Sequence, residues 1–213
     1  MASSLPSYLE KVKVWKISPG RKGKHWEDPF KESSVIALGS GSEGRLDRFR
    51  SKQELRNALN KSFGAGPRCV NYYWKFVKED LINDVVIAYS NSSIYDIGII
   101  VGGYEYDEGS KDYKHRRKTR WLGIVQSPIQ VTDKIILHNM ETRYQVAFAE
   151  LDELTIRRIG ALVEENIESH RLSKLITELE NCVRKKKYRD YLSREESREH
   201  KRLKEHLARK PES

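Results

Sequence analysis

The segment VVIAYSNSSIYDIGIIVGGYEYDEGSKDYKHRRKTRWL, residues 85–122, decides the fold class of this chain. Its runs of β-branched and aromatic residues are separated by Asn91-Ser92-Ser93 and by the polar stretch 107–114, which are typical of turns. With the residues that follow, it predicts strands over 85–89, 94–106, 118–125 and 135–137. Strands at this short, regular spacing, with few helices between them, indicate a small barrel or a strongly bent sheet.

The sequence upstream of this segment adds two more strands. KVKVWKIS, residues 11–18, alternates lysine with β-branched and aromatic residues and predicts a half-buried strand. Pro19-Gly20 ends that strand, and a basic loop follows over residues 21–24. Residues 35–38 predict a second short strand, followed by a Gly/Ser-rich loop over 39–44.

Helices are expected on both sides of the strand-rich segment. Ser51 and Glu54 have the spacing of a capping box and begin a helix that residues 64–67 end. Residues 155–168 predict a helix that packs on the sheet. The same apolar pattern continues at Leu172, Leu175, Ile176, Leu179 and Val183.

The texture of the chain changes near its end. From Arg184 onward it is almost entirely charged, and such a segment cannot bury enough apolar surface to fold alone. We therefore expect one α+β domain over residues 1–170 and a charged helical extension or linker over 171–213.

The overall charge points to polyanionic partners. The 213 residues include 40 Lys plus Arg against 31 Asp plus Glu, which gives a net charge of +9. Such a field favours nucleic acids and makes their binding depend strongly on salt. No apolar run reaches the roughly 20 residues of a membrane span, and no apolar signal segment is found, so we expect a cytoplasmic protein with no membrane partner. Scarce Gln beside abundant Lys, Arg, Glu and Ile is a composition found in thermophiles.

Catalytic and metal motifs are absent from the sequence. It contains no GxxxxGK[ST] loop, no GxSxG turn and no HExxH pair. Cys69 and Cys182 are isolated and are expected to be reduced thiols. No spacing selects a carboxylate cluster for Mg²⁺. We therefore expect a binding protein with no cofactor and no metal, not an enzyme.

Aromatic and basic residues occur together at several strand ends. Aromatic rings stack on unpaired bases for roughly 1–3 kcal/mol each, while Arg and Lys hold the phosphates. A base taken out of a duplex also needs polar groups that read its edge. Trp74 and Trp121 are expected in the core, and Trp15 and Tyr113 in a pocket.

Two stretches resemble a known family. VWKISPGRKGKHWEDPFKESSVIALG, residues 14–39, resembles the opening of EVE-type domains at the N-terminus of McrB-type modification-dependent restriction proteins. Residues 85–122 are similar to their second half, including the run from Tyr113 to Arg117. These domains belong to the PUA-like group, together with YTH and ASCH modules, and the resemblance covers roughly residues 12–163.

The resemblance implies a small bent β-barrel flanked by helices that holds a modified base in an aromatic pocket. In McrB-type proteins such a domain recognises methylated DNA, while a GTP-dependent AAA+ motor and a nuclease subunit perform restriction. The implied base pocket comprises Trp15, Lys16, Ser18, Ser40, Tyr89, Ser90, Asn91, Tyr104, Tyr106 and Tyr113. The expected phosphate contacts are Arg21, Lys22, Lys24, Lys114, His115, Arg116 and Arg117.

The chain departs from this family in two ways. Residues 36–40 lack the aromatic residue that many relatives have there, so we predict a partly degenerate pocket that tolerates several modifications. No GTP-binding motif occurs, so the chain is expected to be either a portion of a larger protein or a stand-alone reader. A PUA-like RNA-binding domain is the alternative, and a scaffold whose charged C-terminal helices dock on a protein is a third hypothesis.

Overall fold

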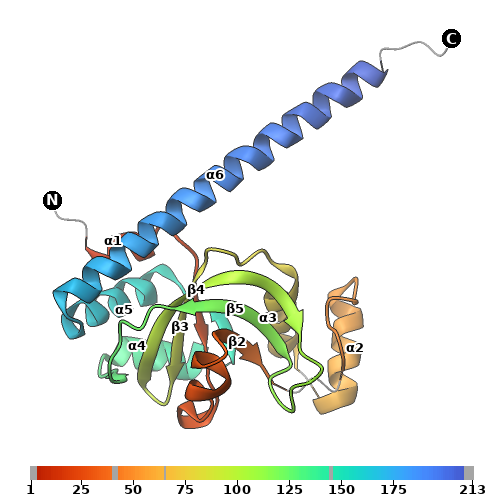
Figure 1. The fold of residues 1–213 in the computed structure, drawn as a ribbon. Coiled ribbons are helices and arrows are strands. Elements are labelled where there is room, and N and C mark those ends of the chain that lie inside the picture. Colours follow the sequence, from red (N-terminus) through yellow and green to blue (C-terminus); the bar gives the residue numbers. More distant parts are fainter. Residues whose placement is uncertain (1–3, 40–42, 65, 144–145, 209–213) are drawn as a thin grey trace.

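A mixed sheet of seven strands forms the centre of the protein (Figure 1). This computed structural model describes residues 4–39, 43–64, 66–143 and 146–208. The strands are β1 (Val14–Ile17), β2 (Val35–Leu38), β3 (Val85–Ser90), β4 (Ser93–Tyr106), β5 (His115–Trp121), β6 (Ile129–Gln130) and β7 (Phe148–Glu150). They pair in the order β2-β5-β4-β3-β1-β7, and β6 pairs with the start of β4. β1 and β3 are parallel neighbours, whereas the other pairs are antiparallel.

Helices cover both faces of the sheet. They are α1 (Leu5–Leu9), α2 (Lys52–Phe63), α3 (Pro67–Lys78), α4 (Lys134–His138), α5 (Glu153–Asn166) and α6 (Ser169–Ala208). Short single turns occupy Arg21–Gly23, Trp26–Lys31 and Asn139–Arg143. In the part of the chain described here, none of these helices is both long and apolar enough to cross a bilayer.

The completely buried strand β3 supplies side chains to two separate apolar layers. Val85 and Ile87 belong to a cluster with residues of α1, α5 and α6. Val86 and Ala88 belong to a second cluster that includes residues of α2 and α3. Since burying one aliphatic side chain of this size stabilises a fold by about 1.5–3 kcal/mol, β3 holds the two layers together.

The first half of α6 is part of the folded body. Leu175, Leu179 and Cys182 are buried in the cluster with α1 and α5. Arg189 forms an ion pair with Asp80. Beyond this point α6 projects away from the sheet (Figure 1). The part of α6 that contacts the folded body therefore extends at least to Arg189.

The α+β class and the C-terminal helices predicted from the sequence are confirmed. β1 and β2 lie within their predicted ranges, and β3 and β4 extend theirs by one residue each. The Ser51 side chain accepts a hydrogen bond from the Glu54 N–H at 3.2 Å, as the capping box predicted. Over the described residues, the strand pairing is an open path from β2 to β7, which Figure 1 shows strongly curved.

Two sequence-based predictions about elements were wrong, and helix α3 was missed. Residues 135–137 lie in helix α4 instead of a strand, because the Asp133 carboxylate accepts hydrogen bonds from the N–H groups of Ile135 and Ile136 at 2.8 and 3.0 Å. The strand expected at 118–125 is β5, which begins and ends earlier. Helix α3 was not predicted, because Pro67 begins it at the first helical position, where proline is favourable.

A buried carboxylate joins the sheet to α6. Asp84 is fully buried, and its Oδ2 accepts a hydrogen bond from the Trp15 indole N–H at 2.8 Å. Its Oδ1 is paired with the Lys186 ammonium of α6. One carboxylate therefore satisfies a core indole and fixes the middle of the long helix.

We predict that Asp84→Ala lowers the free energy of unfolding by about 3–5 kcal/mol, because a partly buried ammonium and a buried indole N–H lose their partner. Urea unfolding followed by circular dichroism measures this loss. Asp80→Ala is the matched control, since its pair with Arg189 is exposed and is expected to contribute less than about 1 kcal/mol. Equal losses in both variants would contradict a structural role for the buried pair.

Candidate functional site

A cavity of about 250 Å³ opens beside the turn between β3 and β4. The parallel register pairs Ile17 of β1 with Ala88 of β3, so the two strands end at the same edge of the sheet. Asn91 and Ser92 form the turn with positive φ angles of 50° and 57°, as the mirror-image two-residue hairpin turn requires. The cavity is lined by Lys16, Ser18, Tyr89, Ser90, Asn91, Ser92, Met140 and Glu141.

Lys16 brings a positive charge to the wall of this cavity. Its side chain is 4% exposed, and its ammonium donates a hydrogen bond to the Val146 carbonyl at 2.9 Å. Burial lowers the pKa of Lys16 to about 8, so the group is still mainly protonated at neutral pH. An ammonium is a donor only, so it favours a ligand that presents acceptors.

The Tyr89 hydroxyl is the unusual polar group of the cavity. Tyr89 is 4% exposed, and within the described residues its oxygen has no hydrogen-bond partner of normal geometry. Burial raises the pKa of Tyr89, and the nearby Ser92 side chain lowers it by less. Buried polar groups in folded proteins are rarely left unpaired, so this hydroxyl is a candidate contact for a ligand atom.

A basic loop is tied to the same edge of the sheet. The Ser90 hydroxyl donates to the Gly20 carbonyl at 2.7 Å and accepts from the Gly23 N–H at 3.3 Å. Gly23 has a φ of 68°, and a Cβ there would overlap the Tyr95 ring at 2.2–2.6 Å, so only glycine fits. These bonds hold the exposed Lys22 and Lys24 next to the cavity.

Half of the predicted base-pocket residues therefore gather at one site. Lys16, Ser18, Tyr89, Ser90 and Asn91 all line the cavity. The expected phosphate-binding residues Lys22 and Lys24 follow in the attached loop, which includes the backbone of Arg21. Ser40 lies outside the described residues.

Trp15 is a core residue, and this placement corrects the expected pocket wall. It is fully buried, and its ring stacks on Phe148 at 4.7 Å between centroids with an interplanar angle of 4°. Lys75 lies 5.3 Å from the Trp15 ring centroid. A ring packed in this way has no face left for a base.

Tyr104 and Tyr106 lie at the other end of β4, around a buried histidine. The Tyr104 hydroxyl is 2.8 Å from Nδ1 of His115, and it accepts a hydrogen bond from the Leu46 N–H at 3.1 Å. The Tyr106 ring centroid is 5.4 Å from that of His115. None of these residues lines the cavity beside the β3–β4 turn, so they do not complete its walls.

His115 and Arg117 are structural residues and not phosphate contacts. His115 is fully buried, and burial lowers its pKa to about 4, although Glu43 opposes this shift. Arg117 is 2% exposed and donates to the carbonyls of Phe76 and Glu79 at 2.6 and 2.8 Å at the end of α3. Buried and engaged in this way, neither side chain reaches a phosphate.

Tyr113 and Arg116 line a separate hollow of about 380 Å³. The Tyr113 ring is 4.6 Å from that of His25. Arg116 pairs with Asp107 at 2.6 Å and donates to the Tyr113 carbonyl at 2.9 Å, so its guanidinium holds its own loop. Lys114 precedes this strand as a partly buried residue.

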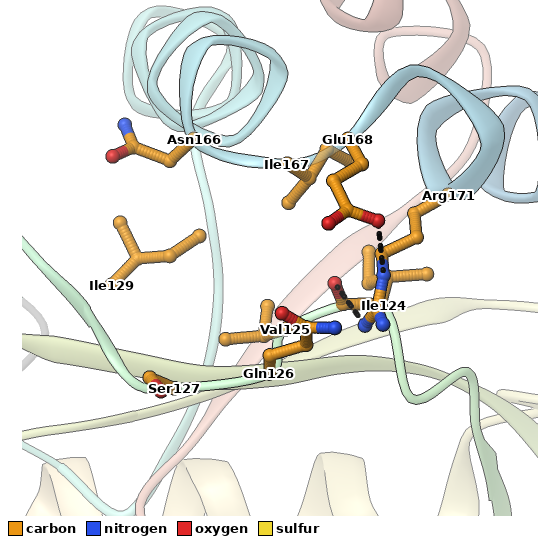
Figure 2. Close-up of a pocket in the computed structure, with 9 residues that line it drawn as sticks. All are labelled: Ile124, Val125, Gln126, Ser127, Ile129, Asn166, Ile167, Glu168 and Arg171. Carbon is orange, nitrogen blue, oxygen red and sulfur yellow. Dashed lines mark hydrogen bonds and ion pairs between the residues drawn. The ribbon is translucent and has the colours of Figure 1, made fainter.

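A further cavity of about 180 Å³ lies where the loop after β5 meets the junction of α5 and α6. Figure 2 shows the Arg171 guanidinium between Glu168 and the Ile124 carbonyl. The distances are 3.4 Å to the Glu168 carboxylate and 3.4 Å to the carbonyl oxygen. Arg171 therefore anchors the start of α6, and this cavity is a packing junction.

Sequence reasoning missed three lining residues of the candidate site, Ser92, Met140 and Glu141. Met140 and Glu141 follow α4, and the Ser92 hydroxyl lies 3.4 Å from the Glu141 carboxylate across 49 positions of sequence. No local pattern marks such a long-range approach. In the ranges that the structure describes, no group of three or more His, Cys, Asp or Glu side chains is arranged to hold a metal ion.

We predict that acid destabilises the protein through His115. The folded pKa of about 4 lies below the ordinary value of 6.5, so the unfolded chain binds more protons between these values and stability falls as the pH falls through this window. The loss approaches about 3 kcal/mol at pH 4. Urea unfolding from pH 7 to 4 measures it, and His115→Gln is expected to flatten this dependence. An unchanged dependence in the variant would assign the acid sensitivity to other groups.

Comparison with known proteins places the chain in a family. No curated protein matches the sequence significantly. A family model described as "Domain of unknown function (DUF8426)" matches residues 15–146, which is more than half of the chain. The matched range contains every residue that lines the cavity beside the β3–β4 turn. The chain therefore belongs to the DUF8426 family of domains of unknown function.

Proposed function

We propose that this protein is a nucleic-acid-binding module that takes one modified base of DNA into the cavity beside the β3–β4 turn. The observation that carries this proposal is the buried Tyr89 hydroxyl, which has no hydrogen-bond partner of normal geometry among the described residues and lines the same cavity as Lys16. The ammonium and the hydroxyl can both form hydrogen bonds with the polar atoms of a ligand, and the sheet does not have to rearrange. A base flipped out of a duplex exposes the hydrogen-bonding atoms of its Watson–Crick edge, and proteins recognise the base through these atoms.

The surroundings of the cavity suit a nucleic-acid backbone. Lys22 and Lys24 are exposed in the loop that Ser90 holds beside the opening, where they can contact the flanking phosphates. The net charge of +9 attracts a polyanion over longer distances.

Recognition in this cavity relies on hydrogen bonds more than on stacking. Among the described residues that line it, Tyr89 is the one aromatic side chain, and the Trp15 ring is packed in the core. A pocket with one ring discriminates weakly by shape, so the proposal includes tolerance for several modifications. We also propose that the domain is PUA-like and that it acts as the specificity domain for a GTP-dependent motor with a nuclease subunit.

The experiment is a competition between matched ligands by fluorescence anisotropy. A labelled duplex with one methylated base competes with the unmodified duplex and with RNA of the same sequence. The proposal predicts that the methylated duplex competes best. Equal competition by the three ligands, or a clear preference for RNA, would overturn it.

Tyr89→Phe separates a ligand contact from a structural role. Because the hydroxyl has no hydrogen-bond partner of normal geometry among the described residues, its removal is expected to leave the free energy of unfolding unchanged or higher. Affinity for the methylated duplex is expected to fall about 2- to 12-fold, the value of one hydrogen bond. Tyr73→Phe is the control, since its hydroxyl donates to the Gly39 carbonyl at 2.6 Å and its loss lowers stability without changing affinity. If Tyr89→Phe binds as the wild type does, the hydroxyl does not touch the ligand.

Binding is also expected to depend on the charge of Lys16. With a pKa of about 8, the ammonium is present below that pH and is lost as the pH rises through it, so affinity decreases from pH 7 to 9. Titrations across this range, compared with those of Lys16→Met, measure the effect. The variant is expected to bind more weakly and with a flatter pH dependence, and parallel curves for the two proteins would exclude Lys16 from the contact.

A further inference from the structure

A second positively charged site lies at the opposite end of the protein, where α1 packs against α6. A groove of about 430 Å³ is lined there by Tyr8, Lys11, Glu180, Val183, Arg184 and Lys187. Its floor contains the Val183 side chain, which packs against the apolar cluster beneath. Figure 1 shows α1 beside the part of α6 from which the helix leaves the folded body.

The three cations of this groove form no ion pair with a carboxylate of the described residues. The Glu180 carboxylate accepts a hydrogen bond from the Tyr8 hydroxyl at 2.8 Å. Lys11 lies over the Tyr8 ring at 4.8 Å. Among the described residues, no carboxylate forms an ion pair with Lys11, Arg184 or Lys187. Their neighbours Lys186 and Arg189, by contrast, pair with Asp84 and Asp80.

Aromatic rings continue the groove along the helix. Tyr188 and Tyr191 are 64% and 59% exposed, which is high for tyrosine, and they lie one helical turn apart. Residues 184–191, RKKKYRDY, carry five cationic side chains and one carboxylate. From Val183 to Tyr191 the helix rises about 12 Å, which is long enough to contact more than one phosphate of a single strand.

We infer that the α1–α6 groove and the adjoining face of α6 bind a single strand of nucleic acid independently of its sequence. Unpaired cations fit the phosphates, and exposed rings next to them fit unstacked bases. A membrane surface fits less well, because Asp190, Glu195 and Glu196 interrupt this stretch of the helix. This inference rests on the proposed nucleic-acid binding and adds to it a contact that does not read the base.

The test is a salt titration of binding to a fluorescein-labelled, unmodified 12-nucleotide oligothymidylate, with the full chain. Arg184→Ala/Lys187→Ala is expected to flatten the slope of log K against log salt by about 1 to 1.5, since each phosphate contact on a single strand contributes about 0.7. Tyr188→Ala/Tyr191→Ala is expected to weaken binding about 5-fold or more at every salt concentration.

The matched control is Arg56→Ala/Lys61→Ala, which removes the same charge from exposed positions of α2. Figure 1 shows α2 at the other side of the sheet from α1. An equal slope change in the control and the groove variant would overturn the inference, because net charge alone would explain both. Stronger binding to phosphatidylserine vesicles or to polyglutamate than to oligothymidylate would also overturn it.

The inference and the proposed function fail in different ways. The groove variant is expected to keep the preference for methylated over unmodified duplex, whereas Tyr89→Phe is expected to reduce that preference and keep the salt slope. If the groove variant shows an unchanged salt slope, the second site is ruled out and the proposal of a base pocket is unaffected. If the wild type shows no preference for the methylated duplex, the base pocket is ruled out and the proposal of the groove site is unaffected.

Discussion

The burial of β3 on both faces is the constraint on which the rest of the structure depends. Its odd-numbered residues face the layer of α1, α5 and α6, and its even-numbered residues face the layer of α3. A shift of one residue in register would exchange the two sets and place Ser90 where Tyr89 lies. Both layers therefore require the same register of β3, and that register fixes the positions of Tyr89 and Ser90 at the end of the strand.

The candidate site is a consequence of this register. Where β3 leaves the core, Tyr89 ends the apolar row on one face and the Ser90 hydroxyl reaches the loop after β1 on the other. The parallel partner β1 brings Lys16 to the same edge, so an ammonium and a phenol approach one cavity from neighbouring strands. Both groups lose hydration there, which lowers the pKa of the lysine and raises that of the tyrosine. The sheet thus holds two polar groups that a ligand edge can satisfy.

The sequence predicted the strands better than the roles of their side chains. β1 is identified by its alternation with lysine and β3 by its run of β-branched and aromatic residues, and the cap at Ser51 is a local hydrogen bond. Such a pattern does not tell which face of a strand is covered, so Trp15 was expected in a base pocket although Phe148, distant in the sequence, covers its ring. Arg117 was expected on phosphates for a similar reason, since the carbonyls that bind it belong to α3, which no pattern predicted. Local features such as strands and helix caps could be predicted from the sequence. Contacts between side chains that are distant in the sequence could not.

The central claim is that a modified base leaves the duplex and enters the cavity between Lys16 and Tyr89. The most direct measurement places the fluorescent base 2-aminopurine beside the methylated base of a duplex and follows its emission as the protein is added. Extrusion of the methylated base removes a stacking neighbour, so emission is expected to rise and to saturate at the stoichiometry found by anisotropy. Saturated binding with unchanged emission would show that the base stays in the stack, and it would contradict the claim.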